Sequence, residues 1–213
     1  MKTEQAHREA IVATMRMLDA KGLNRGTSGN VSVRFEEGML VTPSGVVPDE
    51  LTPESIVYVK ADGNVPEGSA RPSSEWRMHM GIYLRRADTN AVVHCHARNS
   101  TILACANRPI PPLHYMVAVS GGPVVPIAPY STFGSDELAS GVVDTLDGRR
   151  ACLMANHGLI ALGPNLRTAF AIAEEVEEQA AVYCGTLMIG GPVLLDDAQI
   201  AEVMIAFGRY GQR

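Results

Sequence analysis

A run of apolar residues that ends in two histidines constrains this chain more than any other stretch. Residues 91–96 read Ala-Val-Val-His-Cys-His, which is typical of a buried β-strand. Because side chains alternate along a strand, His94 and His96 point to one face and Cys95 points to the other. Two imidazoles on one face can bind a single metal ion, and imidazole suits zinc. The alternative is a pair of surface histidines at a strand end.

Two further stretches supply the groups that such a metal site needs. Residues 151–158 form a second apolar run, which ends in His157 beside Gly158. The sequence Pro-Ser-Ser-Glu at 72–75 adds a carboxylate, Glu75, at the start of a predicted helix. His79 lies one turn further on and is a rival ligand, although a half-buried helix histidine is more often structural. The pattern favours zinc held by His94, His96 and His157, with Glu75 as the acid/base group.

The composition is that of a single globular domain spanning residues 1–213. Hydrophobic residues make up 46% of the chain and charged residues 19%. The formal net charge is -5 without a long basic run, so we expect no nucleic-acid partner. Charges at positions 4, 8 and 9 argue against a signal peptide or a membrane span at the start. The four cysteines form no Cys-x-x-Cys pair, which favours free thiols in a reducing cytoplasm.

Hydrophobic periodicity predicts a chain in which strands and helices are mixed. Helices are predicted over residues 3–21, 100–106, 135–146, 165–189 and 197–207. A further helix is predicted to be capped by Ser73 or Ser74 and to run to about residue 86. Strands are predicted over residues 31–35, 39–42, 56–59, 91–96, 124–127, 151–154 and 159–162. Because strands and helices do not alternate strictly, the order favours an α/β fold with a mixed sheet and helices on both sides.

Small residues gather in loops at 26–30 and 43–45. The first loop leads into a strand and lacks Gly-Lys-Ser/Thr, so it is not a Walker loop. Such a loop can still bind an anion through backbone N–H groups, which would suit a phosphate, although a plain turn fits equally well.

These groups point to two kinds of chemistry. Three neutral imidazoles leave zinc dipositive with an open position, which suits polarisation of a carbonyl. A glutamate beside it can transfer a proton. The residues therefore fit proton or carbon–carbon bond transfer next to a carbonyl, and they fit metal-assisted hydrolysis equally well.

Seven stretches together carry a resemblance to a known family. They read GLNRGTSGNVSVR, GMLVTPSG, PSSEWRMH, AVVHCHA, IPPLHYMVAVSGG, APYSTFG and NHGLIALG. The chain resembles the class II aldolase/adducin family over nearly its whole length. The resemblance implies a single-domain α/β sandwich around a mixed, mostly antiparallel sheet flanked by helices. It also implies a homotetramer with C4 symmetry, whose sites lie between neighbouring subunits.

The resemblance also implies roles for individual residues. One Zn²⁺ per chain, or another divalent metal such as Mn²⁺ or Co²⁺, would be held by His94, His96 and His157. Glu75 would ligate the metal in the empty site and act as acid/base once substrate displaces it. Tyr115 of a neighbouring subunit would protonate the aldehyde-side oxygen. Phe133 and Tyr210 would line the aldehyde end. The substrate phosphate would be bound by Thr27, Gly29, Asn30, Ser44, Gly45, Ser73 and Ser74.

The implied reaction is reversible retro-aldol cleavage of a ketose 1-phosphate in the cytoplasm. A substrate such as L-fuculose 1-phosphate would give dihydroxyacetone phosphate and a short aldehyde such as L-lactaldehyde. Alternatives keep this chemistry on 5-deoxyribulose or 5-methylthioribulose 1-phosphate, or change it to pentulose-phosphate 4-epimerisation or methylthioribulose-1-phosphate dehydration. The epimerases carry aspartate in place of Glu75. A non-catalytic adducin-like scaffold is a further alternative, but that branch lacks the metal histidines.

Overall fold

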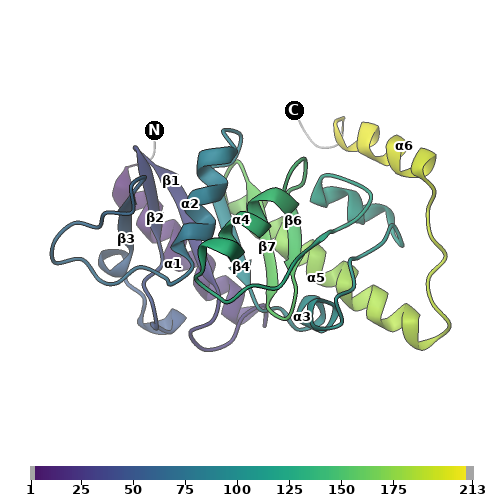
Figure 1. Cartoon of the computed structure of the whole chain (residues 1–213), viewed down its shortest axis with the longest axis horizontal. Helices are drawn as coiled ribbons and strands as arrows, with labels where there is room; N and C mark the ends of the chain where they lie inside the picture. The colour runs from purple at the N-terminus through teal and green to yellow at the C-terminus, as the bar shows by residue number, and fades with distance from the viewer. Residues whose placement is uncertain (1–2, 210–213) are drawn as a thin grey trace.

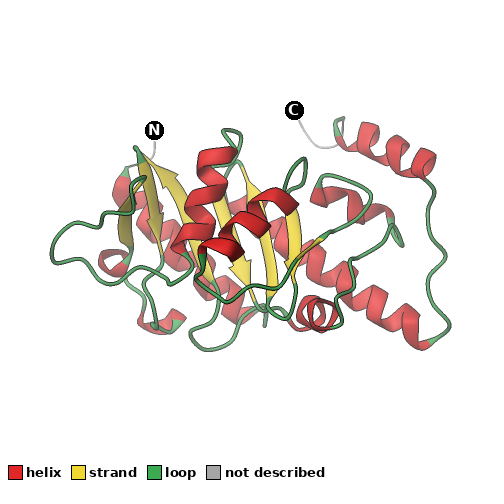
Figure 2. Ribbon diagram, viewed as in Figure 1, coloured by secondary structure: helices red, strands yellow, loops and turns green. Residues whose placement is uncertain are grey.

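A seven-stranded sheet forms the centre of the molecule in this computed structural model, which describes residues 3–209 (Figures 1 and 2). The strands are β1 (Asn30–Phe35), β2 (Gly38–Val41), β3 (Val57–Lys60), β4 (Ala91–Cys95), β5 (Ile127–Ala128), β6 (Ala151–Met154) and β7 (Gly158–Gly163). Their order in the sheet is β3-β2-β1-β4-β7-β6-β5. Neighbouring strands pair antiparallel except β5 and β6, which are parallel. The predicted mixed, mostly antiparallel sheet is therefore confirmed.

Helices cover both faces of the sheet, as predicted. They are α1 (Glu4–Ala20), α2 (Trp76–Arg85), α3 (Arg98–Cys105), α4 (Asp136–Thr145), α5 (Leu166–Met188) and α6 (Asp197–Phe207), with 3₁₀ turns η1 (Pro48–Glu50), η2 (Pro53–Ser55) and η3 (Tyr115–Ser120). One hydrophobic core packs α1, α3 and α5 against one face of the sheet. A second core packs α2 and α4 against the other face, which is the face turned to the viewer in Figure 2. Alternate residues of each strand supply the two cores.

Two predicted boundaries are wrong, each for a local reason. Helix α2 begins at Trp76, with Glu75 as its N-cap residue, because the Glu75 carboxylate contacts His94 and His157 and makes no capping hydrogen bond. The serine at 73 instead accepts the backbone N–H of Glu75 at 3.3 Å. The predicted strand at 124–127 is reduced to β5, because Pro126 has no N–H to donate. Its carbonyl still accepts the N–H of Leu153 at 2.8 Å.

Helix α6 lies apart from the sandwich. The extended segment 189–196 leads to it, and it lies away from the sheet in Figure 1. Among its described residues Ile200 is buried, and the helix packs against η3. Met188, Ile189 and Val193, which precede the helix, are largely exposed apolar side chains. None of the helices formed by residues 3–209 is long and apolar enough to cross a membrane.

Candidate functional site

The antiparallel pairing of β4 with β7 brings the three predicted metal histidines together. Cys95 pairs with Leu159, so the end of β4 lies beside the start of β7. The ring centroids of His94, His96 and His157 lie 4.9–5.0 Å from one another. One ring nitrogen of each histidine lies within 4.8 Å of the other two. These distances allow all three imidazoles to face a single ion.

The turn before β7 has a backbone that few residues allow. Asn156 has a φ of 55°, in the left-handed region that asparagine tolerates. Its N–H donates to the carbonyl of Ala104 at 3.1 Å, which holds the turn against α3. A Cβ at Gly158 would lie 2.6 Å from the Cys95 carbonyl oxygen and 3.0 Å from Cδ2 of His96. A glycine is therefore needed here for β7 to approach the β4 histidines.

Hydrogen bonding fixes the orientation of His94. Its Nδ1–H donates to the carbonyl oxygen of Leu159 at 2.8 Å, so Nε2 faces the cluster. Glu75 closes the site from the α2 side. Its Oε2 lies 3.1 Å from Nε2 of His94, and its Oε1 lies 3.3 Å from Nε2 of His157.

Burial and neighbouring charges determine the protonation states of Glu75 and His94. Burial alone would raise the pKa of the Glu75 carboxyl, but the neighbouring His94 lowers it below its ordinary value. Contacts with His157 and the Asn30 amide contribute to the same shift. Burial would lower the pKa of His94, but the Glu75 carboxylate raises it overall. Glu75 is therefore ionised at neutral pH and favours a proton on His94.

The donor set fits a divalent cation. Burial, with the charge of His94, lowers the pKa of both His96 and His157 to about 4, so both are neutral and able to coordinate at pH 7. Oε1 of Glu75 is buried yet has no hydrogen-bond partner among the described residues. Three imidazole nitrogens and a carboxylate are a ligand set typical of zinc.

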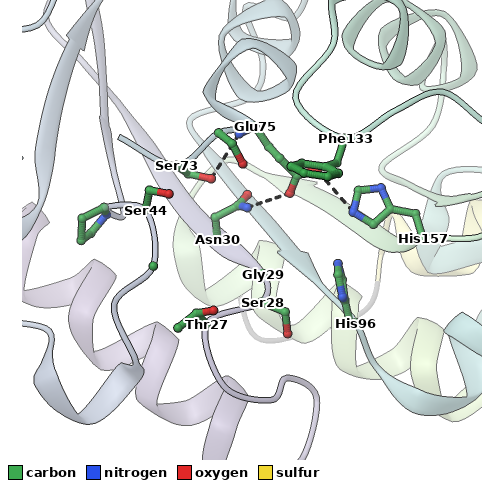
Figure 3. Close-up of a pocket in the computed structure, with 13 residues that line it drawn as sticks. Thr27, Ser28, Gly29, Asn30, Ser44, Ser73, Glu75, His96, Phe133 and His157 are labelled. Carbon is green, nitrogen blue, oxygen red and sulfur yellow. Dashed lines mark hydrogen bonds and ion pairs between the residues drawn. The ribbon is translucent and has the colours of Figure 1, made fainter. Parts of the chain in front are cut away.

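A pocket opens beside this cluster and gathers the small-residue loops around it. It is lined by Thr27, Ser28, Gly29, Asn30, Pro43, Ser44, Gly45, Ser73, Ser74, Glu75, His96, Phe133 and His157. All seven residues expected to bind a phosphate are in this set. Figure 3 shows the loops on one side of the pocket and the imidazoles of His96 and His157 on the other. The described lining residues include no lysine or arginine.

A buried asparagine that sequence reasoning missed braces the first loop. The amide of Asn24 donates to the Ser28 carbonyl, and its oxygen accepts the backbone N–H of His96 at 3.4 Å. Gly29 has a φ of 73°, and a Cβ there would lie within 2.8 Å of Asn24 side-chain atoms. The signal for Asn24 was its position inside the stretch GLNRGTSGN, directly before the loop.

The side chain of Asn30 faces Glu75 as well as the pocket. Its amide nitrogen donates to Oε2 of Glu75 at 2.9 Å, as Figure 3 shows. Its oxygen lies 2.6 Å from Nε2 of His79. His79, the rival ligand of the sequence, is fully buried behind Asn30 and does not belong to the histidine cluster. Sequence reasoning also missed Ser32, whose hydroxyl lies 2.7 Å from Nδ1 of His79. The sequence feature that could have identified Ser32 is a polar residue between two valines in a predicted strand.

The structure describes two of the three residues expected at the aldehyde end, Phe133 and Tyr115, and these two do not line the same pocket. Phe133 lines the pocket and is 66% exposed. Tyr115 lies on η3 with its ring centroid 6.4 Å from that of Phe207, is 48% exposed, and does not line this pocket. Tyr210 lies outside the described residues.

The chain is similar to a described protein family and to proteins named as aldolases. A model of the family described as "Class II Aldolase and Adducin N-terminal domain" matches residues 9–184. An L-fuculose phosphate aldolase of Escherichia coli (strain K12) is 48% identical over 95% of this chain and 94% of its own. A 5-methylthioribulose-1-phosphate/5-deoxyribulose-1-phosphate aldolase of Rhodospirillum rubrum is 45% identical to this chain. The match covers 97% of this chain and 93% of that protein. A solved L-fuculose 1-phosphate aldolase superimposes with a TM-score of 0.92 at 40% identity, covering 95% of this chain and 96% of that one.

Proposed function

The chain belongs to the class II aldolase and adducin family, and on that premise we propose that it is a divalent-metal-dependent aldolase acting on a ketose 1-phosphate. Cleavage breaks the bond between C3 and C4 of the sugar. Carbons 1–3 leave as dihydroxyacetone phosphate and the rest leaves as an aldehyde. We propose L-fuculose 1-phosphate as the substrate and L-lactaldehyde as the second product, because relatives named for this activity are 48% identical to the chain.

One observation carries this proposal: the histidine cluster, Glu75 and a pocket lined by small polar residues occur in one place. A divalent cation, with zinc as our first choice, would polarise the substrate carbonyl when bound by His94, His96 and His157. Phe133 lines the pocket and is largely exposed, so the pocket is open to solvent on the side of Phe133.

Glu75 is the residue we assign to proton transfer at C3. It is ionised in the resting protein and lies beside the cluster. In aldol addition it takes the C3 proton of dihydroxyacetone phosphate, and Tyr115 of a neighbouring subunit gives a proton to the aldehyde oxygen that becomes the C4 hydroxyl. Solvent then takes the proton from Glu75 and returns one to Tyr115. In cleavage the same transfers run in reverse: Tyr115, having lost its proton to solvent, takes the C4 hydroxyl proton, and Glu75, having gained one from solvent, gives it to C3.

The phosphate is assigned to the loops at 26–30, 44–45 and 73–74. Glycines and hydroxyl-bearing residues of these loops line the pocket, while its described lining includes no lysine or arginine. Binding therefore rests on many hydrogen bonds to a fixed anion rather than on an opposing cation. Sugars without the phosphate are expected to be poor substrates.

Assembly into a C4 homotetramer is proposed on two grounds. Tyr115 is exposed outside the pocket of its own chain, so a second chain has to supply it to the site. The segment before α6 carries exposed Met188, Ile189 and Val193, an apolar surface that association would bury. We place the enzyme in the cytoplasm, because its four cysteines are free thiols.

A second candidate substrate class is supported by the 45% identity to the aldolase named for 5-methylthioribulose and 5-deoxyribulose 1-phosphates. These sugars share carbons 1–3 and the phosphate with L-fuculose 1-phosphate, so they differ only in the aldehyde half. Selection between these two substrate classes depends on the residues that contact the aldehyde half, which we assign to Phe133 and the neighbouring subunit, rather than on the metal cluster.

A panel of ketose 1-phosphates tests the proposal directly. We expect purified protein to hold about one zinc per chain, to release dihydroxyacetone phosphate from L-fuculose 1-phosphate, and to lose this activity on chelation and regain it with zinc. Faster release from the deoxyribulose or methylthioribulose sugars would select the second candidate. Full activity in metal-free protein, or no release from any member of the panel, would contradict the proposal.

A further inference from the structure

We propose that His79 and Ser32 are positioning residues that act through Asn30 to hold one oxygen of Glu75 in place and leave the other free for proton transfer. The inference rests on the proposed function for the role of Glu75. His79 and Ser32 are buried polar residues that belong neither to the histidine cluster nor to the pocket lining.

The contacts form an unbroken chain inside the protein. Oε2 of Glu75 accepts from the amide of Asn30 at 2.9 Å, and the Asn30 oxygen lies 2.6 Å from Nε2 of His79. Nδ1 of His79 lies 2.7 Å from Oγ of Ser32. The chain ends at Tyr83, whose hydroxyl lies 2.7 Å from the same Oγ. Asn30 and Ser32 come from β1 of the sheet, and the other residues come from α2, which packs on the sheet, and from its N-cap.

The ionised carboxylate determines the direction of every bond in this chain. Since Glu75 can only accept, Asn30 turns its NH₂ group toward Glu75 and its oxygen toward His79. That oxygen needs a donor, so His79 carries its proton on Nε2 and leaves Nδ1 as an acceptor. Ser32 has one hydroxyl proton and donates it to Nδ1, and Tyr83 then donates to Ser32.

Burial makes this arrangement rigid. His79 and Ser32 are 0% exposed, so neither side chain can exchange its partner for water. If Asn30 rotated its amide by half a turn, two oxygens would face each other at Glu75 and two N–H groups would face each other at His79. Inside the protein, such unpaired polar groups are costly. His79 therefore locks the amide of Asn30.

As a consequence, the two oxygens of Glu75 have different roles: one is held by a hydrogen bond and the other is free to transfer a proton. Oε2 is occupied by the amide of Asn30, whereas Oε1 has no hydrogen-bond partner among the described residues. A carboxylate that could turn freely would present either oxygen at varying distances. Held through Oε2, Glu75 keeps Oε1 directed to the side of the site where His157 lies. Oε1 is the atom we assign to the C3 proton.

Two substitutions of His79 separate positioning from simple packing. His79→Gln places an amide N–H where Nε2 lies and can still donate to Asn30, whereas His79→Met fills a similar volume without a donor. We expect His79→Met to lower kcat by about ten- to a hundredfold, the usual cost of removing a partner that orients a site residue. KM should stay within about threefold, and His79→Gln should recover most of the lost kcat.

Two controls accompany these variants. Thr14→Val removes a buried hydrogen-bonding group from α1, where its hydroxyl donates to the Ala10 carbonyl at 2.8 Å. Thr14 belongs neither to the pocket lining nor to the histidine cluster. The substitution should lower the unfolding temperature and leave kcat unchanged. Zinc content should stay at one per chain in both His79 variants, because His79 is not a member of the cluster. Equal losses of kcat in His79→Gln and His79→Met, or no loss in His79→Met, would overturn the inference.

A spectroscopic test does not depend on activity. Long-range ¹H–¹⁵N spectra of ¹⁵N-histidine-labelled protein, with the His79 signals assigned by their loss in His79→Gln, report which ring nitrogen carries the proton. We expect Nε2–H in both metal-free and zinc-loaded protein. A proton on Nδ1 instead would leave the Asn30 oxygen without a donor at His79 and would overturn the inference. If the wild type cleaves no ketose 1-phosphate, the proposed function fails, and this spectrum still decides whether the hydrogen-bonded chain is as described.

Discussion

At the scale of single residues, the site depends on a buried carboxylate that stays ionised. Burying an unpaired charge is unfavourable, and Glu75 is only 6% exposed. Its pKa is nevertheless lowered, because the opposing effect of His94 and the hydrogen bond from Asn30 outweigh burial. The carboxylate is therefore ready to accept a proton at neutral pH.

Replacement of this carboxylate by an amide tests its role. We expect Glu75→Gln to keep the fold and the metal and to lose cleavage by roughly two to four decades, the contribution typical of acid/base groups. It should also stop exchange of the C3 proton of dihydroxyacetone phosphate with deuterated water, followed by NMR. Glu67→Gln, a change in an exposed loop, is the matched control and should exchange normally. Undiminished exchange in Glu75→Gln would assign the base to another residue.

Metal binding should depend on pH through His94. The Glu75 carboxylate raises the pKa of His94 above its ordinary value, so the metal-free protein holds a proton there below that pKa. A cation has to displace this proton, so zinc affinity should rise as pH rises through the pKa and level off above it. Calorimetric titrations in buffers of different ionisation enthalpy should show proton release on zinc binding that declines as the pH is raised through this pKa. An affinity independent of pH would contradict this assignment.

At the scale of elements, the site depends on how closely β7 approaches β4. We expect Gly158→Ala to destabilise the fold by about 1–3 kcal/mol, because its Cβ would meet the backbone at Cys95. Zinc affinity should also fall, since the same Cβ lies 3.0 Å from the His96 ring. Thermal unfolding and zinc titration measure the two effects.

A second glycine provides the control for this change. Gly185 lies within α5, where an added Cβ would meet nothing within 4 Å. Gly185→Ala should therefore leave zinc binding unchanged and stabilise the helix by about 0.5–1 kcal/mol. Equal effects of the two substitutions would show that the approach of the strands does not limit the site.

At the scale of the whole molecule, the proposed tetramer predicts that two inactive variants can restore each other. If Tyr115 reaches the site of a neighbouring chain, each site takes Glu75 from one chain and Tyr115 from the next. Glu75→Gln and Tyr115→Phe then remove groups that different chains supply to the same site. Chains of the two variants, unfolded together and refolded as a mixture, should form intact sites in about a quarter of cases. Activity after mixing, compared with each variant refolded alone, measures this. No recovery in an assembly shown by ultracentrifugation to be tetrameric would place Tyr115 elsewhere.

Much of the local structure was predictable from the sequence. The seven strands, the helix order and the two-histidine face at the end of β4 follow from periodicity, which depends on neighbouring residues alone. The start of α2 did not follow, because the serines at 73 and 74 are both good N-caps. Glu75 is the N-cap residue instead, and its carboxylate contacts His94 and His157, which are far from it in the sequence.

The sequence by itself determined which side chains carry the chemistry: the histidines at strand ends, the carboxylate at 75 and the small-residue loops. Only the tertiary structure decided how they meet. Antiparallel pairing of β4 with β7 brings His94 to within reach of His157, and packing of α2 over β1 turns Asn30 toward Glu75. The physical reason is range, since periodicity and capping act within a few residues. Strand order and buried hydrogen bonds instead depend on the burial of surface between segments that are distant in sequence.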